Sequence, residues 1–116
     1  MNLTTDHSQG LAIVRIGETR LMYPLLSEFS AAVLGLIAQG EKRVLIDLSK
    51  VTYVDSATIG CFMDMYRQAS AAGTSLKLSG VQKRVETMLT MTGAQNFLEL
   101  HADEASAVRS FEGLMP

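Results

Sequence analysis

The sequence has few of the residues on which several protein classes depend. Among its 116 residues are one cysteine, two histidines and no tryptophan. The single Cys61 cannot form a disulfide within the chain. The most continuous apolar stretch, Ala31–Ala38, is far shorter than the roughly 20 residues that cross a bilayer. Residues 1–10 lack the basic and apolar regions of a secretory signal, and we therefore expect a cytoplasmic protein without membrane insertion.

Charge is also sparse and balanced. Only 19% of the residues are charged, and ten Lys and Arg against twelve Asp and Glu give a formal net charge of -2. The chain has no basic block and no platform of aromatic side chains, which argues against a nucleic-acid partner. Hydrophobic residues make up 47%, enough to bury a core. We expect a single domain over residues 1–116, with residues 1–10 poorly ordered.

Strand and helix patterns alternate along the chain. Runs of alternating or continuous apolar residues predict strands, and apolar residues at helical spacing predict helices that end at glycines. The predicted strands are 11–16, 19–23, 44–48, 75–79 and 97–100, and the predicted helices are 24–40, 57–73, 81–93 and 103–111. A strand, a helix and a further strand at this spacing form a crossover between parallel strands. The sequence therefore predicts an α/β fold, a small mixed sheet of four to five strands with about four helices packed mainly on one face.

The segment Val54–Gly60 joins an apolar run to an amphipathic helix and contains Ser56 near the predicted helix start. Either Ser56 or Asp55 could cap that helix. A nucleophilic Ser56 would need a neighbouring base, and the only histidines, His7 and His101, lie elsewhere in the pattern. A third interpretation makes Ser56 the target of a kinase. We expect no enzyme activity, no cofactor and no metal site.

The apolar and loop segments together resemble the STAS domain, and most closely the bacterial anti-sigma factor antagonists. The similar segments are Leu45–Leu48, Val51–Gly60, Gly73, Leu76–Leu78 and Val85–Gly93. The resemblance implies that Ser56, directly after Asp55, is phosphorylated by an anti-sigma factor that is a serine kinase. It also implies that the unmodified protein binds this kinase and frees the sigma factor, and that a PP2C-type serine phosphatase reverses the modification.

The resemblance and helical geometry together suggest which residues contact the partner. If Ile59, Phe62, Met63 and Tyr66 face the sheet, Thr58, Cys61 and Met65 share a flank next to Ser56. That flank is either a docking surface or is covered by the last helix. The segment Gly17–Leu21 corresponds to one that often helps to form the partner-binding face. The candidate contact residues are Asp55, Ser56, Ala57, Thr58, Cys61, Met65, Glu18 and Arg20.

Two positions depart from the family's usual loop, and they motivate a second hypothesis. Ala57 and Thr58 stand where the family often has Ser or Thr and then Gly, and Gly17–Leu21 lacks the family's aspartate. The alternative is a constitutive STAS subunit, a scaffold of a stress-signalling assembly or an accessory protein of a lipid or anion transport complex.

Overall fold

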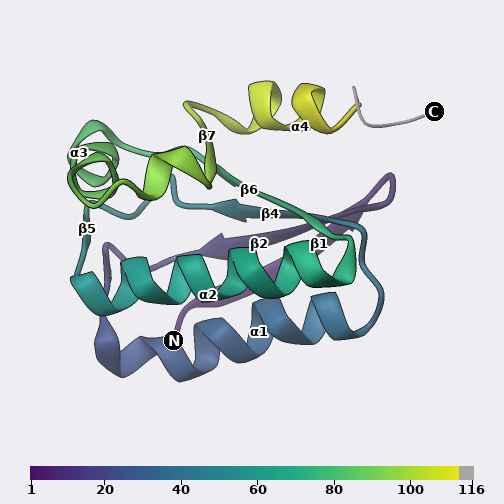
Figure 1. Cartoon of the computed structure of the whole chain (residues 1–116), viewed down its shortest axis with the longest axis horizontal. Helices are drawn as coiled ribbons and strands as arrows, with labels where there is room; N and C mark the ends of the chain where they lie inside the picture. The colour runs from purple at the N-terminus through teal and green to yellow at the C-terminus, as the bar shows by residue number, and fades with distance from the viewer. Residues whose placement is uncertain (113–116) are drawn as a thin grey trace.

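A mixed sheet lies between helices on both of its faces (Figure 1) in the computed structural model, which describes residues 1–112. The strand order is β1-β2-β4-β6-β7. β1 is antiparallel to β2, and the remaining neighbours are parallel. The strands are β1 (Leu3–Ser8), β2 (Leu11–Ile16), β4 (Arg43–Asp47), β6 (Ser75–Ser79) and β7 (Glu99–His101). The predicted α/β class with a small mixed sheet is confirmed.

Residues 1–112 also form four α-helices and two short 3-10 helices. The α-helices are α1 (Leu26–Ala38), α2 (Ser56–Ala72), α3 (Lys83–Met91) and α4 (Glu104–Glu112); the 3-10 helix η1 (Tyr23–Leu25) precedes α1, and η2 (Ala94–Asn96) follows α3. Pro24 lies in η1, where its missing amide hydrogen is not needed. Gly73 ends α2 with φ +73°, a left-handed conformation that glycine adopts without a steric penalty.

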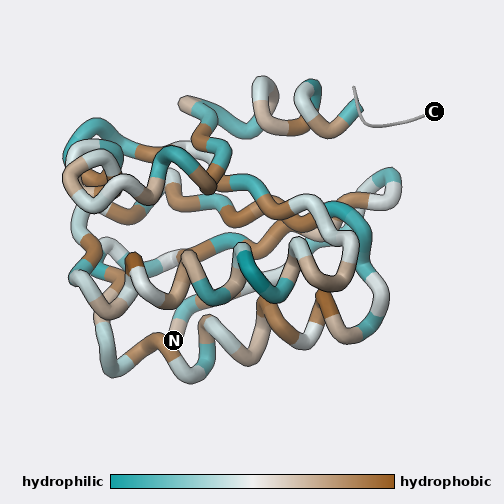
Figure 2. Tube along the Cα trace, viewed as in Figure 1, coloured by the Kyte–Doolittle hydropathy of each residue, from teal (hydrophilic) through white to brown (hydrophobic). Residues whose placement is uncertain are grey.

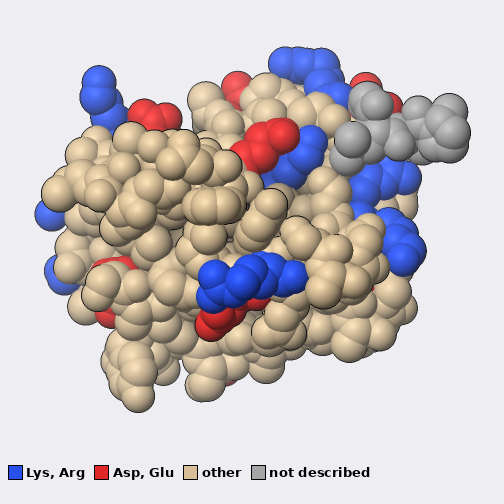
Figure 3. All heavy atoms as spheres, in the orientation of Figure 1, with Lys and Arg blue, Asp and Glu red and all other residues tan. Residues whose placement is uncertain are grey.

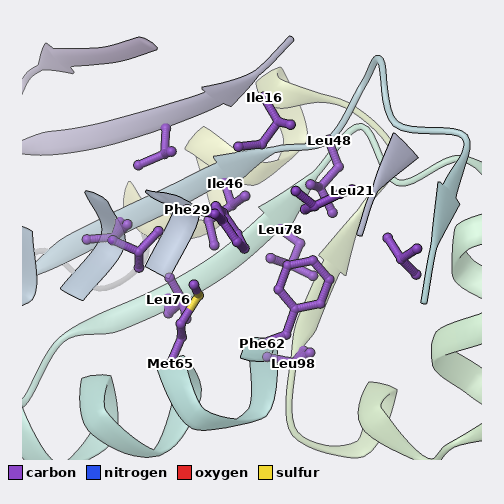
Figure 4. Close-up of a cluster of buried hydrophobic side chains, with 14 of the residues drawn as sticks. Ile16, Leu21, Phe29, Ile46, Leu48, Phe62, Met65, Leu76, Leu78 and Leu98 are labelled. Carbon is purple, nitrogen blue, oxygen red and sulfur yellow. The ribbon is translucent and has the colours of Figure 1, made fainter. Parts of the chain in front are cut away.

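Most of the core lies on the face of the sheet that α1, α2 and α3 cover. On this face, side chains of α1 and α2 pack against the apolar residues of β2, β4 and β6, as Figure 4 shows for Phe29, Phe62 and Met65. The rings of Phe29 and Phe62 pack edge to face, with centroids 5.8 Å apart. Hydrophobic residues are frequent along the central strands of the sheet, as the trace coloured by hydropathy shows (Figure 2). The prediction that the helices pack mainly on one face is confirmed.

Helix α4 alone packs on the opposite face, over a small cluster of buried residues. The cluster consists of Leu11, Ile13, Leu45, Ala107 and Phe111. The side chain of Lys77 is only 7% exposed there, with its Nζ atom 2.9 Å from a Glu99 carboxylate oxygen and 4.6 Å from the centre of the Phe111 ring. A buried ammonium is tolerated because these two groups compensate its lost hydration.

Residues 1–10, for which the sequence predicted no strand, contain one in the structure. Leu3–Ser8 forms the edge strand β1, which pairs with all of β2. The hairpin turn holds two residues with positive φ, Gln9 and Gly10, as short hairpin turns require. An ion pair from Arg15 Nε to Asp6, 2.7 Å long, adds a contact across the strands. The order of β1 therefore comes from its partner strand rather than from its own weak apolar pattern.

Two of the predicted strands are shorter than expected. The strand predicted at 97–100 begins only at Glu99, because the amide of Leu98 still donates to the carbonyl of Ala94 in the preceding turn. Phe97 is consequently 55% exposed. Within 19–23, the strand is limited to Arg20–Leu21 (β3), which pairs in parallel with Tyr53–Val54 (β5).

Candidate functional site

The side chain of Asp55 fixes the start of α2. It occupies the N-cap position in an extended conformation, and its Oδ1 atom accepts a 2.8 Å hydrogen bond from the amide of Thr58. Its other oxygen accepts a 3.0 Å bond from the amide of Tyr23 in η1. Burial raises the pKa of Asp55, but the hydrogen bonds from Thr58 and Tyr23 outweigh this and lower it below the ordinary value. One ionised carboxylate thus joins α2 to the segment that follows β3.

The buried side chain of Thr58 also connects α2 to the segment of β3. Its side chain is fully buried, with Oγ1 at 2.8 Å from the Leu21 carbonyl oxygen and 2.6 Å from Asp55 Oδ1. The single hydroxyl hydrogen can be donated to only one of these oxygens at a time. The amide of Thr52 also donates to the carbonyl of Thr19, at 2.7 Å. Segments 19–23 and 52–58 are therefore held together beside Ser56, and Thr58 is part of that connection.

Ser56 is the first residue of α2 and is exposed to solvent. Because Asp55 supplies the cap, the Ser56 hydroxyl is not needed for that role. The next exposed positions on this face of α2 are Ala57 and Gly60. A Cβ atom added at Gly60 would meet nothing within 4 Å. The surface next to Ser56 thus carries only small side chains, and a partner could approach the helix backbone closely there.

The predicted flank of Thr58, Cys61 and Met65 is not a docking surface. Thr58 and Met65 are 0% and 1% exposed and belong to the core, so both are wrong as contact residues. The covering element is α1 and not the last helix, since Phe29 packs on α2 and the Cys61 thiol lies beside Ser30.

The side chain of Cys61 itself is half-buried. Burial raises the pKa of the thiol. The sequence analysis did not single out Gly60 as an exposed position beside Ser56, although its helical spacing from Ser56 and Ala57 would have indicated it.

The two candidates from the Gly17–Leu21 segment differ in their surroundings. The half-buried Glu18 accepts a 2.6 Å hydrogen bond from the amide of Asn2, which engages one carboxylate oxygen at the protein surface. Arg20 is exposed and its guanidinium lies 4.9 Å from the centre of the Tyr53 ring. Arg84 of α3 lies over the same ring at 5.7 Å. Arg20 therefore lies beside the Ser56 loop. Its contact with Tyr53, shared with Arg84, was not indicated by the sequence.

Two features of other protein classes are absent from residues 1–112. No group of three or more His, Cys, Asp or Glu side chains is placed to hold a metal ion. None of the helices described for these residues has the length and apolarity that a membrane span requires.

Comparison with known proteins connects this geometry to a family. A family model described as Mlab, STAS domain, matches residues 19–100, which include the whole Ser56 loop. The chain belongs to the STAS domain family. It is 28% identical over 73 residues to the anti-sigma-B factor antagonist of Bacillus subtilis (strain 168), covering 63% of this chain and 67% of that protein. Anti-sigma factor antagonists are thus among the relatives of this STAS domain.

Solved structures confirm the fold. The anti-sigma factor antagonist SpoIIAA of Bacillus, in its unphosphorylated form, matches with a TM-score of 0.79 at 16% identity, covering 98% of this chain and 99% of that one. A sulfate transporter family protein from Wolinella succinogenes matches with a TM-score of 0.82 at 18% identity, covering 92% and 88%. The same STAS fold therefore occurs in proteins of different function.

Proposed function

We propose that this STAS domain is an anti-sigma factor antagonist whose binding is switched by phosphorylation of Ser56. The observation that carries the proposal is the exposed Ser56 hydroxyl at the first position of α2, held in place by the Asp55 cap. The similarity to an anti-sigma-B factor antagonist supports the class of partner. In its unmodified form the protein binds a serine-kinase anti-sigma factor and releases the sigma factor. It acts as a binding protein and a kinase substrate, not as an enzyme.

The switch is a phosphoryl transfer. The kinase moves the γ-phosphoryl group of ATP to Ser56 Oγ, so that one O–P bond forms, the bond to ADP breaks and the hydroxyl proton leaves to the kinase or to water. A PP2C-type phosphatase hydrolyses the ester with water and releases inorganic phosphate. Only Ser56 changes covalently in either direction.

The position of Ser56 explains how a phosphate could block binding without unfolding the domain. A phosphoserine carries about 1.5 to 2 negative charges at neutral pH, and free amides and the dipole at a helix N-terminus favour an anion. The fold should therefore tolerate the modification. A partner packed over Ser56, Ala57 and Gly60 would instead have to desolvate that phosphate beside the ionised Asp55, which weakens binding.

The contact surface in this proposal differs from the one that helical spacing suggested. Thr58 and Met65 serve the fold, and the partner contacts Ser56, Ala57 and Gly60 on α2. Tyr23, whose side chain is 73% exposed and whose amide is bonded to Asp55, extends this surface from η1.

The test is phosphate transfer. The purified protein is incubated with ATP and each serine-kinase-type anti-sigma factor of its source organism, and the modified residue is mapped by mass spectrometry. We expect phosphate on Ser56 of the parent protein and none on Ser56→Ala. Ser70→Ala, an exposed serine of the same helix, should be phosphorylated like the parent. Transfer that is unaffected by Ser56→Ala would contradict the proposal.

The STAS fold of a sulfate transporter family protein favours a second candidate, a constitutive STAS subunit of a lipid or anion transport complex or a scaffold of a stress-signalling assembly. In that case no candidate kinase would modify Ser56, and the protein would bind a transporter or scaffold component equally well with Ser56 and with Ser56→Asp. A neighbouring gene for a transporter ATPase would point the same way.

A further inference from the structure

Two arginines share one aromatic ring next to the Ser56 loop. Arg20 comes from β3 and Arg84 from the first turn of α3, and their guanidinium carbons lie 4.9 and 5.7 Å from the centre of the Tyr53 ring. Both residues are exposed and Tyr53 is half-buried. Attraction to the ring holds each guanidinium in a defined place. The two side chains are therefore less mobile than isolated arginines on a protein surface.

This pair of charges has no internal counter-charge. Within residues 1–112, no carboxylate oxygen lies within the 4.0 Å salt-bridge distance of either Arg20 or Arg84, while Arg15 has three carboxylate partners. Arg84 also sits in the first turn of α3, where the helix dipole disfavours a cation. Lys and Arg side chains accordingly lie along the margin of the molecule where β5 and α3 are found (Figure 3). Two like charges held together in this way favour an anion nearby.

Ser56 lies within reach of the pair. It comes three positions after Tyr53, so their Cα atoms are at most about 11 Å apart. Arg20 pairs with Tyr53 across the two short strands, and the amide of Tyr23, three residues later, is bonded to Asp55. The segments carrying Arg20 and Ser56 therefore run side by side (Figure 1). Because Tyr53 and Ser56 are close neighbours in the chain, an anion attached to Ser56 would lie within the range of attraction of both guanidinium groups at low salt, since the Debye length is about 30 Å at 0.01 M.

We propose that Arg20 and Arg84, held over Tyr53, are the internal counter-charge for a phosphate on Ser56. This inference rests on the proposed phosphorylation of Ser56 and adds the residues that stabilise the phosphorylated state. The two arginines offset the repulsion between the phosphate and the ionised Asp55. They also draw the dianionic form of the phosphate toward the protein, so that fewer cationic groups remain for a partner's acidic side chains.

The experiment needs no kinase, because phosphoserine can be placed at position 56 during translation. The second pKa of the phosphate is then followed by phosphorus NMR at low salt in the parent, Arg20→Gln and Arg84→Gln. A guanidinium at about 10 Å favours the dianion, so removing either one should raise this pKa by about 0.3 to 1. Arg20→Lys, which keeps the charge, should restore most of the parent value. High salt should shrink the difference between the parent and the Gln variants.

Lys42→Gln is the matched control, an exposed cation before β4, at the end of the strand remote from the Ser56 loop. It should leave the second pKa unchanged, and proton NMR spectra should show that every variant is folded. A second pKa that is the same in the parent, Arg20→Gln and Arg84→Gln would overturn the inference. Failure of the proposed function is a separate result, the absence of phosphate transfer to Ser56 by any kinase, and it would not alter the titration of the installed phosphoserine.

Discussion

Replacing Asp55 by alanine tests how the Ser56 loop is built. The substitution removes the cap of α2, which is worth about 1 kcal/mol in most helices. It also removes the bond from the Tyr23 amide, worth about another 1 kcal/mol, since this exposed amide can bond to water instead. Thr58 Oγ1 keeps the carbonyl of Leu21 as an acceptor. We expect Asp55→Ala to lower the free energy of unfolding by about 2 kcal/mol at pH 7.

The loss of stability in Asp55→Ala should depend on pH, and the hydrogen bonds to Asp55 determine the direction of that dependence. The pKa of Asp55 is lowered in the folded protein from its ordinary value of 3.8, because Thr58 and Tyr23 outweigh burial. The stabilisation is therefore complete above 3.8 and is lost as the pH falls through the lower, folded-state pKa. The difference in stability between the parent and Asp55→Ala should be constant near neutral pH and should narrow in acid.

The assay is urea unfolding followed by circular dichroism, with an unchanged slope as evidence that only stability differs. Asp64→Ala is the control, because this exposed carboxylate of the same helix forms a surface ion pair with Arg67. It should change stability by less than about 0.5 kcal/mol. The stability of Asp55→Asn should fall between those of Asp55→Ala and Asp64→Ala. The Asn side-chain oxygen can accept the hydrogen bond from the Thr58 amide, but the side-chain NH2 group cannot accept the one from the Tyr23 amide. Equal stability of Asp55→Ala and Asp64→Ala, or a difference independent of pH, would refute the account of the loop.

Three further outcomes follow from the surroundings of α2. Met65→Ala should cost about 2 to 5 kcal/mol in an unfolding assay and the half-buried Met63→Ala clearly less, whereas equal losses would mean that the helix faces another way. Gly60→Gln should leave the domain as stable as before or raise its stability by up to about 1 kcal/mol, yet weaken binding of the anti-sigma factor by about tenfold or more. Unimpaired binding would remove Gly60 from the contact surface. Cys61 should react with a disulfide reagent at pH 7 more slowly than in the urea-unfolded chain, because burial raises the pKa of its thiol, and a faster reaction would contradict this.

The order of elements was readable from the sequence because each element carries its own pattern. The mostly apolar run at 44–48 marks β4, which lies at the centre of the sheet with Val44, Leu45 and Ile46 buried, and Gly73 marks the end of α2. The strand β1 was missed since its residues are mostly exposed, and its order depends on pairing with β2. Pairing between segments does not appear in the periodicity of either one.

The candidate site was readable in part for the same reason. Asp55 and Ser56 were placed correctly at the helix start, which local residue preferences determine. The burial of Thr58 and Met65 depends on segments distant in the chain, such as β3, whose Leu21 carbonyl accepts a hydrogen bond from Thr58, and the spacing of apolar residues in α2 cannot show that. The stack of Arg20 and Arg84 on Tyr53 joins β3, β5 and α3, so it emerges only from the three-dimensional arrangement.

The affinity of the anti-sigma factor kinase for this STAS domain, with and without phosphate on Ser56, tests the central claim most directly. Isothermal titration calorimetry would compare the unmodified protein with the protein carrying translated phosphoserine at position 56. We expect the unmodified form to bind and the phosphorylated form to bind at least about a hundredfold more weakly, with the same fold by NMR. Equal affinities of the two forms would contradict a phosphorylation switch at Ser56.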